Sequence, residues 1–192
     1  MKAYDEGEIG KLEGMLAAVP EPGPAPVESW NPPYCGDIGL AIRSNGSWEY
    51  QGSPIRRDRL VKLFASVLRK DVDGRTYLVT PAEKIDVKVD DAPFLAIEME
   101  VQGEGEQQKL FFRTNVDDVV QCGRENPLRF AAQGPDGGLK PYVLVRGRLE
   151  ALLTRALLHD LVSLAIEHPE DGLLGIWSAG VFFPIETALS EP

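Results

Sequence analysis

The spacing of apolar residues along the chain follows two periods, and each period predicts one kind of element. Apolar residues three or four positions apart are typical of a helix that buries one face, and this spacing occurs at 8–19, at 60–68 and from 149 to about 167. Alternation of apolar and polar residues, which puts successive side chains on opposite faces of a strand, dominates residues 84–113. The pattern predicts an α+β protein.

Residues that favour turns divide the alternating segments into strands. Asn45-Gly46 stands between two strand-like runs within residues 38–50, and Asn-Gly in such a place is a strong hairpin signal. Turns expected at 90–93 and 103–105 divide residues 84–113 into three antiparallel strands. The same pattern predicts further strands at 75–80, 128–132, 142–146 and 176–183.

Several of these expected elements occur twice in the same order. A hairpin, a helix, a strand and a Pro-x-Glu sequence are expected in 38–83 and again in 127–186. We therefore expect two related halves produced by domain duplication, 27–84 and 85–192, with an antiparallel sheet and the long helix in the second. Prolines at alternate positions end the first helix and predict an extended linker, so residues 1–26 form an appendage.

The charge of the chain limits its partners. The sequence has 20 Lys and Arg residues against 30 Asp and Glu residues, which gives a net charge of −10. An acidic surface repels nucleic-acid phosphates and anionic lipids, so we expect neither general nucleic-acid binding nor membrane binding. The longest mostly apolar stretch, 173–185, is shorter than the ~20 residues of a membrane-spanning helix, and we interpret it as buried strand.

Cysteine usage indicates a reducing compartment. Cys35 and Cys122 form no paired motif, whereas small secreted scaffolds carry more cysteines. We expect a cytoplasmic protein that carries no cofactor.

The sequence favours no class of enzyme. It contains no G-x-S-x-G, Walker A or H-E-x-x-H motif, each of which places reactive groups at a fixed spacing. One catalytic alternative stays open, because paired carboxylates can hold a divalent cation, and Asp37 or Asp117 would then serve a metal-assisted hydrolase. Aspartates also form turns and helix caps, which is the plainer interpretation.

Arginines occur at the expected starts of two helices, Arg56, Arg57 and Arg59 at the first and Arg146 and Arg148 at the second. Cations at a helix N-terminus oppose the helix dipole, so their repetition in an acidic protein invites an explanation. One explanation is an anion held by free backbone N–H groups and arginine side chains. The other is a set of solvated arginines that pair with the abundant carboxylates.

Trp48 and Tyr50 alternate with Glu49, so both aromatic rings project from one face of a strand. Aromatic side chains so placed stack on the ring of a ligand in many proteins. A place in the hydrophobic core is the alternative for both.

Several short segments between residue 30 and the expected long helix form a recognisable set. They are Trp30-x-Pro-x-x-Cys35-Gly36-Asp37-Ile38, Trp48-x-Tyr50-x-Gly52-x-Pro54-Ile55, Leu60-Val61-x-Leu63-Phe64, Tyr77-Leu78-Val79-Thr80-Pro81-x-Glu83-Lys84, Asp91-Ala92-Pro93-Phe94, Thr114-Asn115-Val116-Asp117-Asp118 and Pro141-Tyr142-Val143-Leu144-Val145-Arg146. Through this set the chain resembles a bacterial family known as domain of unknown function 1285 (DUF1285).

The resemblance implies a duplicated α+β core, a C-terminal half superficially like a pleckstrin-homology fold, a signalling role, and a ligand site between the halves that suits a nucleotide-like molecule. We therefore expect a regulatory module that binds a small anionic ligand of nucleotide type. The expected site residues are Arg56 and Arg146 for the anion, Trp48 and Tyr50 for a ring, and Thr80, Lys84 and Asn115 for further hydrogen bonds. A protein-interaction adaptor that uses the C-terminal half is the remaining alternative.

Overall fold

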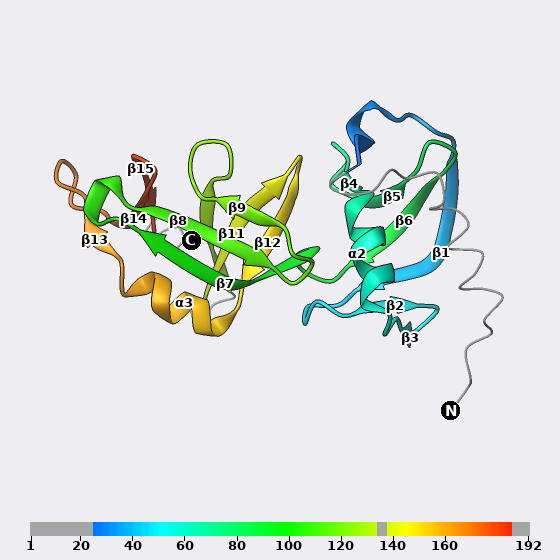
Figure 1. Cartoon of the computed structure of the whole chain (residues 1–192), viewed down its shortest axis with the longest axis horizontal. Coiled ribbons are helices and arrows are strands. Elements are labelled where there is room, and N and C mark those ends of the chain that lie inside the picture. The colour runs from blue at the N-terminus through cyan, green and yellow to red at the C-terminus, as the bar shows by residue number, and fades with distance from the viewer. Residues whose placement is uncertain (1–24, 134–137, 186–192) are drawn as a thin grey trace. The chain divides into compact units, whose positions relative to one another are not determined.

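A computed structural model describes residues 25–133 and 138–185 of the chain. These residues belong to two units, Met1–Asp90 and Asp91–Pro192, each with a six-stranded sheet (Figure 1). The two-unit α+β architecture expected from the sequence is thereby confirmed. The helix expected at 8–19 lies outside the described residues.

The sheet of the first unit has the strand order β3-β2-β1-β6-β5-β4. Its two central strands, β1 and β6, run parallel, and the other neighbouring pairs are antiparallel. Parallel neighbours cannot be joined by a tight turn, and all the other elements of the sheet lie between these two strands in the chain. The elements are η1 (Val27–Ser29), β1 (Tyr34–Ile42), β2 (Trp48–Tyr50), β3 (Ser53–Pro54), α2 (Asp58–Ser66), β4 (Leu68–Lys70), β5 (Thr76–Val79) and β6 (Lys84–Val89).

Helix α2 covers one face of this sheet (Figure 1). Phe64 of α2 stacks on Trp48 of β2, with ring centroids 5.9 Å apart. Leu68, Leu78 and Ile85 form one row across β4, β5 and β6, and all three are buried. Because side chains alternate along a strand, the residues between these positions point to the other face of the sheet.

The hairpin between β1 and β2 confirms the Asn-Gly signal. Gly46 has a φ of 79°, a value that glycine adopts without the steric cost of a side chain, and Ile42 pairs with Trp48 across the turn. The helix that follows begins at Asp58, so Arg56 precedes the helix in the loop after β3.

The sheet of the second unit has the strand order β10-β11-β12-β7-β8-β9. Here β12 and β7 are the parallel pair, and the remaining neighbours are antiparallel. A helix and a separate three-stranded sheet follow in the chain. The elements are β7 (Phe94–Gln102), η2 (Gly105–Gln107), β8 (Lys109–Thr114), β9 (Val119–Gln121), β10 (Leu128–Gln133), β11 (Gly138–Arg146), β12 (Leu149–Leu153), α3 (Arg155–Val162), β13 (Ile166–Glu167), β14 (Leu174–Ser178) and β15 (Val181–Pro184).

The prediction of a long helix that begins at residue 149 is wrong. Residues Leu149–Leu153 form strand β12, and only Arg155–Val162 are helical. The strand resembles a helix in sequence because Leu152, on its less buried face, is apolar as well. Pairing with β11 on one side and β7 on the other decides the conformation, an effect of tertiary context that a local pattern does not contain. Arg146 and Arg148 therefore lie beside a strand turn and not at a helix start.

The three antiparallel strands expected within 84–113 are divided between the units. Strand β6 pairs with β1 and β5 in the first sheet, whereas β7 and β8 form the expected antiparallel pair in the second. The first unit therefore continues to Asp90 instead of ending at residue 84.

The single strand expected at 176–183 is a hairpin of β14 and β15. Its turn contains Ala179 and Gly180, both at positive φ, and the absence of a proline or Asn-Gly there hid it from the sequence pattern.

Gly175 in β14 is required by close packing. A Cβ atom at this position would lie 2.4 Å from the ring of Phe182 and 2.6 Å from the carbonyl oxygen of Phe183. We expect Gly175→Ala to lower the free energy of unfolding by about 1–3 kcal/mol, as overpacked substitutions do. Urea denaturation followed by circular dichroism measures the change, and Gly172→Ala, which meets open space but strains a φ of 73°, is the comparison. An unchanged midpoint for Gly175→Ala would contradict this packing.

The two six-stranded sheets share one topology. If the strands of each sheet are counted from its own first strand, both have the order 3-2-1-6-5-4, with strands 1 and 6 parallel. The helices differ in place, because α2 precedes the fourth strand of its sheet and α3 follows the sixth. The equivalence is thus β1–β6 with β7–β12, and not the one expected between 38–83 and 127–186, since Val181–Pro184 belongs to the three-stranded sheet.

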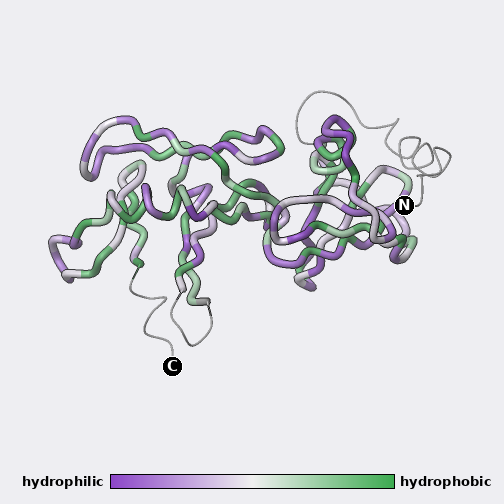
Figure 2. The backbone as a smooth tube through the Cα atoms, turned by 90° about the horizontal axis from the view of Figure 1, so that it is seen from below, coloured by the Kyte–Doolittle hydropathy of each residue, from purple (hydrophilic) through white to green (hydrophobic). Residues whose placement is uncertain are grey.

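Hydrophobic and hydrophilic residues alternate closely along the strands of each unit (Figure 2). Among the described residues, no helix is both long enough and apolar enough to cross a membrane.

Candidate functional site

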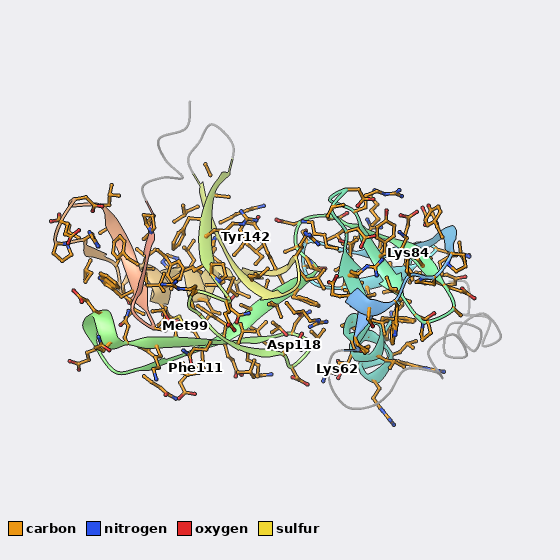
Figure 3. All side chains as sticks on the ribbon, turned by 90° about the horizontal axis from the view of Figure 1, so that it is seen from above. Lys62, Lys84, Met99, Phe111, Asp118 and Tyr142 are labelled. Atoms are coloured by element: carbon orange, nitrogen blue, oxygen red, sulfur yellow. The ribbon has the colours of Figure 1, made fainter. Side chains whose placement is uncertain are left out.

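The face of the first sheet that points away from α2 is polar. Arg69, Tyr77, Asp86 and Asp37 form one row across β4, β5, β6 and β1, offset by one residue from the buried leucine row. Figure 3 shows Lys84, on this face, and Lys62, on α2, on opposite sides of the unit. The alternation along β5 and β6 thus puts core residues on one face and charged or hydroxyl groups on the other.

Asp86 lies at the centre of this face and is bound by two donors. The Arg75 guanidinium donates to Oδ1 at 2.5 Å, and the Tyr34 hydroxyl donates to Oδ2. The hydrogen bond to the Asp86 carboxylate raises the pKa of Tyr34, because loss of the phenol proton would place two negative charges side by side. These bonds hold the Tyr34 side chain in place although 53% of the residue is exposed.

The ring of Tyr77 joins the charged groups of this face. Its hydroxyl donates to Asp73 Oδ2 at 2.6 Å, and this bond, with burial, raises the pKa of Tyr77 to about 12. The Lys84 ammonium lies 4.5 Å from the ring centroid and the Arg75 guanidinium 5.5 Å, which are cation–π distances. Tyr34 meets the same ring edge to face at 6.4 Å.

Arg69 fixes the edge of the face. It is 8% exposed, and its Nη1 donates to the carbonyl oxygens of Val27 and Trp30 at 2.8 and 2.7 Å. Its Nε donates to Asp71 at 2.6 Å. Burial opposes ionisation of Asp71, but the hydrogen bonds from Arg69 and Lys84 outweigh burial and lower the pKa of this carboxyl. The fork geometry of arginine suits this structural role.

A hollow of about 580 Å³ opens beside this network. Its volume falls within the range of sites for small molecules, roughly 300–1,000 Å³. The lining residues are Tyr34, Asp37, Gly74, Arg75, Thr76, Asp86, Val87, Lys88 and Val89.

Several charged groups of the hollow have donors or acceptors that make no hydrogen bond within the described residues. Within residues 25–133 and 138–185, the Lys88 ammonium has no hydrogen-bond or ion-pair partner. The Arg75 guanidinium donates to Asp86 and also interacts with Tyr34, which leaves some of its five N–H groups for a ligand. Asp37 accepts the N–H of Gly39 at 2.7 Å through Oδ1, and its Oδ2 has no partner in the same part of the chain. The hollow therefore offers two cations, one carboxylate oxygen and an exposed tyrosine ring to a ligand.

Comparison with known proteins places the chain in a family. Residues 25–92 match the family model described as domain of unknown function (DUF1285), N-terminal domain, and residues 93–185 match protein of unknown function (DUF1285), C-terminal domain. The chain belongs to the DUF1285 family. The boundary between the two DUF1285 models lies within two residues of the boundary between the units.

Two solved DUF1285 structures resemble this chain. A crystal structure of a DUF1285 family protein from Silicibacter pomeroyi DSS-3 has 46% sequence identity and a TM-score of 0.84, and the match covers 91% of this chain and 93% of that one. A DUF1285 family protein from Shewanella baltica OS155 has 25% identity and a TM-score of 0.51, over 66% of this chain and 91% of that one. No curated protein matches this DUF1285 chain.

Three of the site residues expected in the first unit lie away from the hollow. Trp48 is 1% exposed and packs on Phe64, so its ring belongs to the core. Tyr50 accepts a hydrogen bond from Gln51 at 3.1 Å and is half-buried. Arg56 is exposed in the loop before α2, and the helix start that made it a candidate begins two residues later, at Asp58.

Thr80 and Lys84 are held by neighbours on the same sheet. Thr80 is buried, and its hydroxyl accepts the N–H groups of Ala82 and Glu83, which stabilises the turn between β5 and β6. Lys84 binds Asp71 at 3.2 Å and covers the Tyr77 ring, so it belongs to the polar face beside the hollow.

The two expected site residues of the second unit also have structural partners. Asn115 Oδ1 accepts the N–H of Leu95 at 2.9 Å. The Arg146 guanidinium donates to Asp118 and lies 5.0 Å from the ring centroid of Phe94. Both side chains connect strands or turns within the second sheet.

The carboxylates of the hydrolase alternative lie in turns. Asp117 has a φ of 69° and binds Arg113 at 3.1 Å, and Asp37 bonds to the backbone two residues on. Within the described ranges, no group of three or more His, Cys, Asp or Glu side chains is placed to hold a metal ion. The aspartates thus follow the turn interpretation, and the hydrolase alternative has no assembled site in this part of the chain.

Three residues that line the hollow, Arg75, Asp86 and Lys88, were not predicted from the sequence. They come together only through the β5–β6 register, in which Tyr77 lies opposite Asp86. One local signal was available: Asp86 and Lys88 alternate with the core residues Ile85 and Val87 along one strand, and a charged group inside such a strand is commonly bound by partners on the same face.

Proposed function

We propose that this protein is a small-ligand-binding regulatory module, and that the hollow of the first unit holds an anionic ligand of nucleotide type. Lys88, which has no partner in the described structure, supplies a charge-assisted hydrogen bond to a phosphate group. Arg75 adds to it those N–H groups that Asp86 and Tyr34 do not take up. The exposed ring of Tyr34 provides a surface on which a base can stack.

The free ammonium of Lys88 is the observation that carries this proposal, since Arg75 beside it is already paired with Asp86. The protein has a net charge of −10, and elsewhere on the same face the cations Arg69 and Lys84 are bound by Asp71. A cation left without a carboxylate in an acidic protein favours an external anion. The uncommitted Asp37 oxygen adds an acceptor for ligand hydroxyl or amino groups.

Isothermal titration calorimetry of the full chain with AMP, ADP, GMP and cyclic AMP tests the proposal, with adenosine and inorganic phosphate as part ligands. We expect at least one nucleotide to bind, and we expect Lys88→Ala or Arg75→Ala to weaken it by about tenfold or more, which corresponds to about 1.4 kcal/mol. Lys109→Ala and Arg59→Ala are the matched controls, because both are exposed and lie outside the hollow. The proposal fails if no nucleotide binds, or if the controls weaken binding as much as the hollow variants do.

The role, location and fold likeness that the DUF1285 resemblance implies belong to the same proposal. A signalling role, a cytoplasmic location and a pleckstrin-homology-like C-terminal unit are compatible with a ligand-responsive module. Domain duplication is supported by the strand order 3-2-1-6-5-4 that the two sheets have in common. The adaptor alternative and a ligand between the halves stay predictions.

A further inference from the structure

The second sheet repeats the surroundings of the Tyr77 ring. Tyr142 lies on β11, the fifth strand of its sheet, and pairs with Arg129 on the fourth strand, as Tyr77 pairs with Arg69. The Arg129 guanidinium lies 4.1 Å from the ring centroid, and the Tyr142 hydroxyl donates to Asp91 at 2.8 Å. The same strands therefore carry the same kind of tyrosine network in both units.

A second hollow, of about 350 Å³, lies at the equivalent place in the second unit. In the first unit the three positions before the tyrosine line the hollow, together with the residue opposite the tyrosine and the next one along that strand. The same five positions of the second unit line its hollow. In the order just given, the pairs are Gly74 and Leu139, Arg75 and Lys140, Thr76 and Pro141, Asp86 and Leu152, and Val87 and Leu153.

The chemistry of the second hollow differs from that of the first. The cation is kept at one position, as Lys140, but Asp86 is replaced by Leu152 and Gly74 by Leu139. Leu158 adds a further apolar wall from α3, which follows the sixth strand only in this unit. Leu139, Leu152 and Leu158 are each only partly buried, so an apolar surface faces the hollow.

Two cations border these apolar walls. Lys140 is held by Asp91 at 2.6 Å. Arg155, the first residue of α3, is exposed and has no hydrogen-bond or ion-pair partner among the described residues. The first turn of α3 contains no acidic residue, and Thr154 makes no side-chain cap, so the positive end of the helix dipole adds to the charge of Arg155.

We propose that this hollow binds a small amphiphilic anion, that is, an apolar chain that ends in a carboxylate. The chain lies against Leu139, Leu152 and Leu158, and the carboxylate binds the Arg155 guanidinium. Apolar walls with one or two oriented polar groups are the usual composition of a small-molecule site. The site is independent of the nucleotide proposal, because it lies wholly in the second unit.

Octanoate is the probe, and methyl-labelled full-length protein is the reporter in nuclear magnetic resonance titrations. We expect octanoate to shift the methyl signals of Leu139, Leu152 and Leu158. Octan-1-ol, which lacks the charge, and acetate, which lacks the chain, are each expected to bind about tenfold more weakly or worse.

The variant Arg155→Glu is expected to weaken octanoate binding by about tenfold or more and to leave the remaining methyl spectrum unchanged. Arg124→Glu, an exposed arginine outside the hollow, is the matched control and is expected to change the affinity by less than about twofold. The proposal is overturned if octanoate shifts none of the three leucines, if octan-1-ol binds as well as octanoate, or if the two variants weaken binding equally.

Discussion

Trp48→Ala is expected to lower the free energy of unfolding by about 3–5 kcal/mol, the usual cost of removing a buried aromatic side chain. The indole is 1% exposed and stacks on Phe64 of α2, so its loss leaves a cavity between helix and sheet. Urea denaturation followed by circular dichroism measures the change.

Trp48→Phe is the control that separates packing from ligand binding. The Trp48 indole N–H is buried and has no hydrogen-bond partner within the described part of the chain, so a phenyl ring removes an unsatisfied donor as well as some volume. We expect a smaller loss, about 1–2 kcal/mol, and a nucleotide affinity within about twofold of the unaltered protein. A large loss of affinity in the stable Trp48→Phe protein would instead make Trp48 part of a ligand site.

Arg69→Met is expected to lower the free energy of unfolding by about 3–5 kcal/mol, which is the usual result when one partner of a buried ion pair is removed. The guanidinium holds two carbonyl oxygens of the η1 segment as well as Asp71, and methionine leaves all of them without this donor. Arg75→Met is the comparison, and because its side chain is 56% exposed we expect a change below about 1 kcal/mol. Equal costs for the two variants would contradict the structural role of Arg69.

Arg69→Met also changes how the free energy of unfolding depends on pH. The lowered pKa of Asp71 means that its ionised form stabilises the fold above the pKa of the unfolded chain, and that this contribution disappears as the pH falls through the folded-state pKa. Without Arg69 the pKa of Asp71 rises toward its ordinary value, so Arg69→Met is expected to show a weaker loss of stability on acidification. A denaturation series between neutral and acidic pH measures this slope.

Local signals predicted the elements that local interactions determine. The helix expected at 60–68 is present as Asp58–Ser66, although Leu68 begins strand β4, and the Asn45-Gly46 hairpin is present as well. Helical spacing and turn chemistry act over a few residues. The parallel pairing of β1 with β6 was not predicted, since it joins residues about fifty positions apart. The local pattern predicts a helix where β12 lies, because the apolar residues of this strand satisfy both periods.

The candidate site was predicted less well than the fold because it depends on strand register. Trp48 and Arg146 were selected for residue type and expected helix starts, but the structure gives both of them packing or ion-pair partners. Lys84, which we expected to hydrogen-bond a ligand, binds Asp71 and covers the ring of Tyr77. The partners of Asp86 come from two different strand connections, which no spacing along the chain reveals.

A crystal structure of the protein with the nucleotide that binds best in calorimetry shows whether the hollow of the first unit is the ligand site. We expect a phosphate oxygen within about 3 Å of a nitrogen of Arg75 or Lys88, with the base against the ring of Tyr34. A nucleotide held by Arg56 or Arg146, with the hollow of the first sheet left untouched, would contradict this expectation.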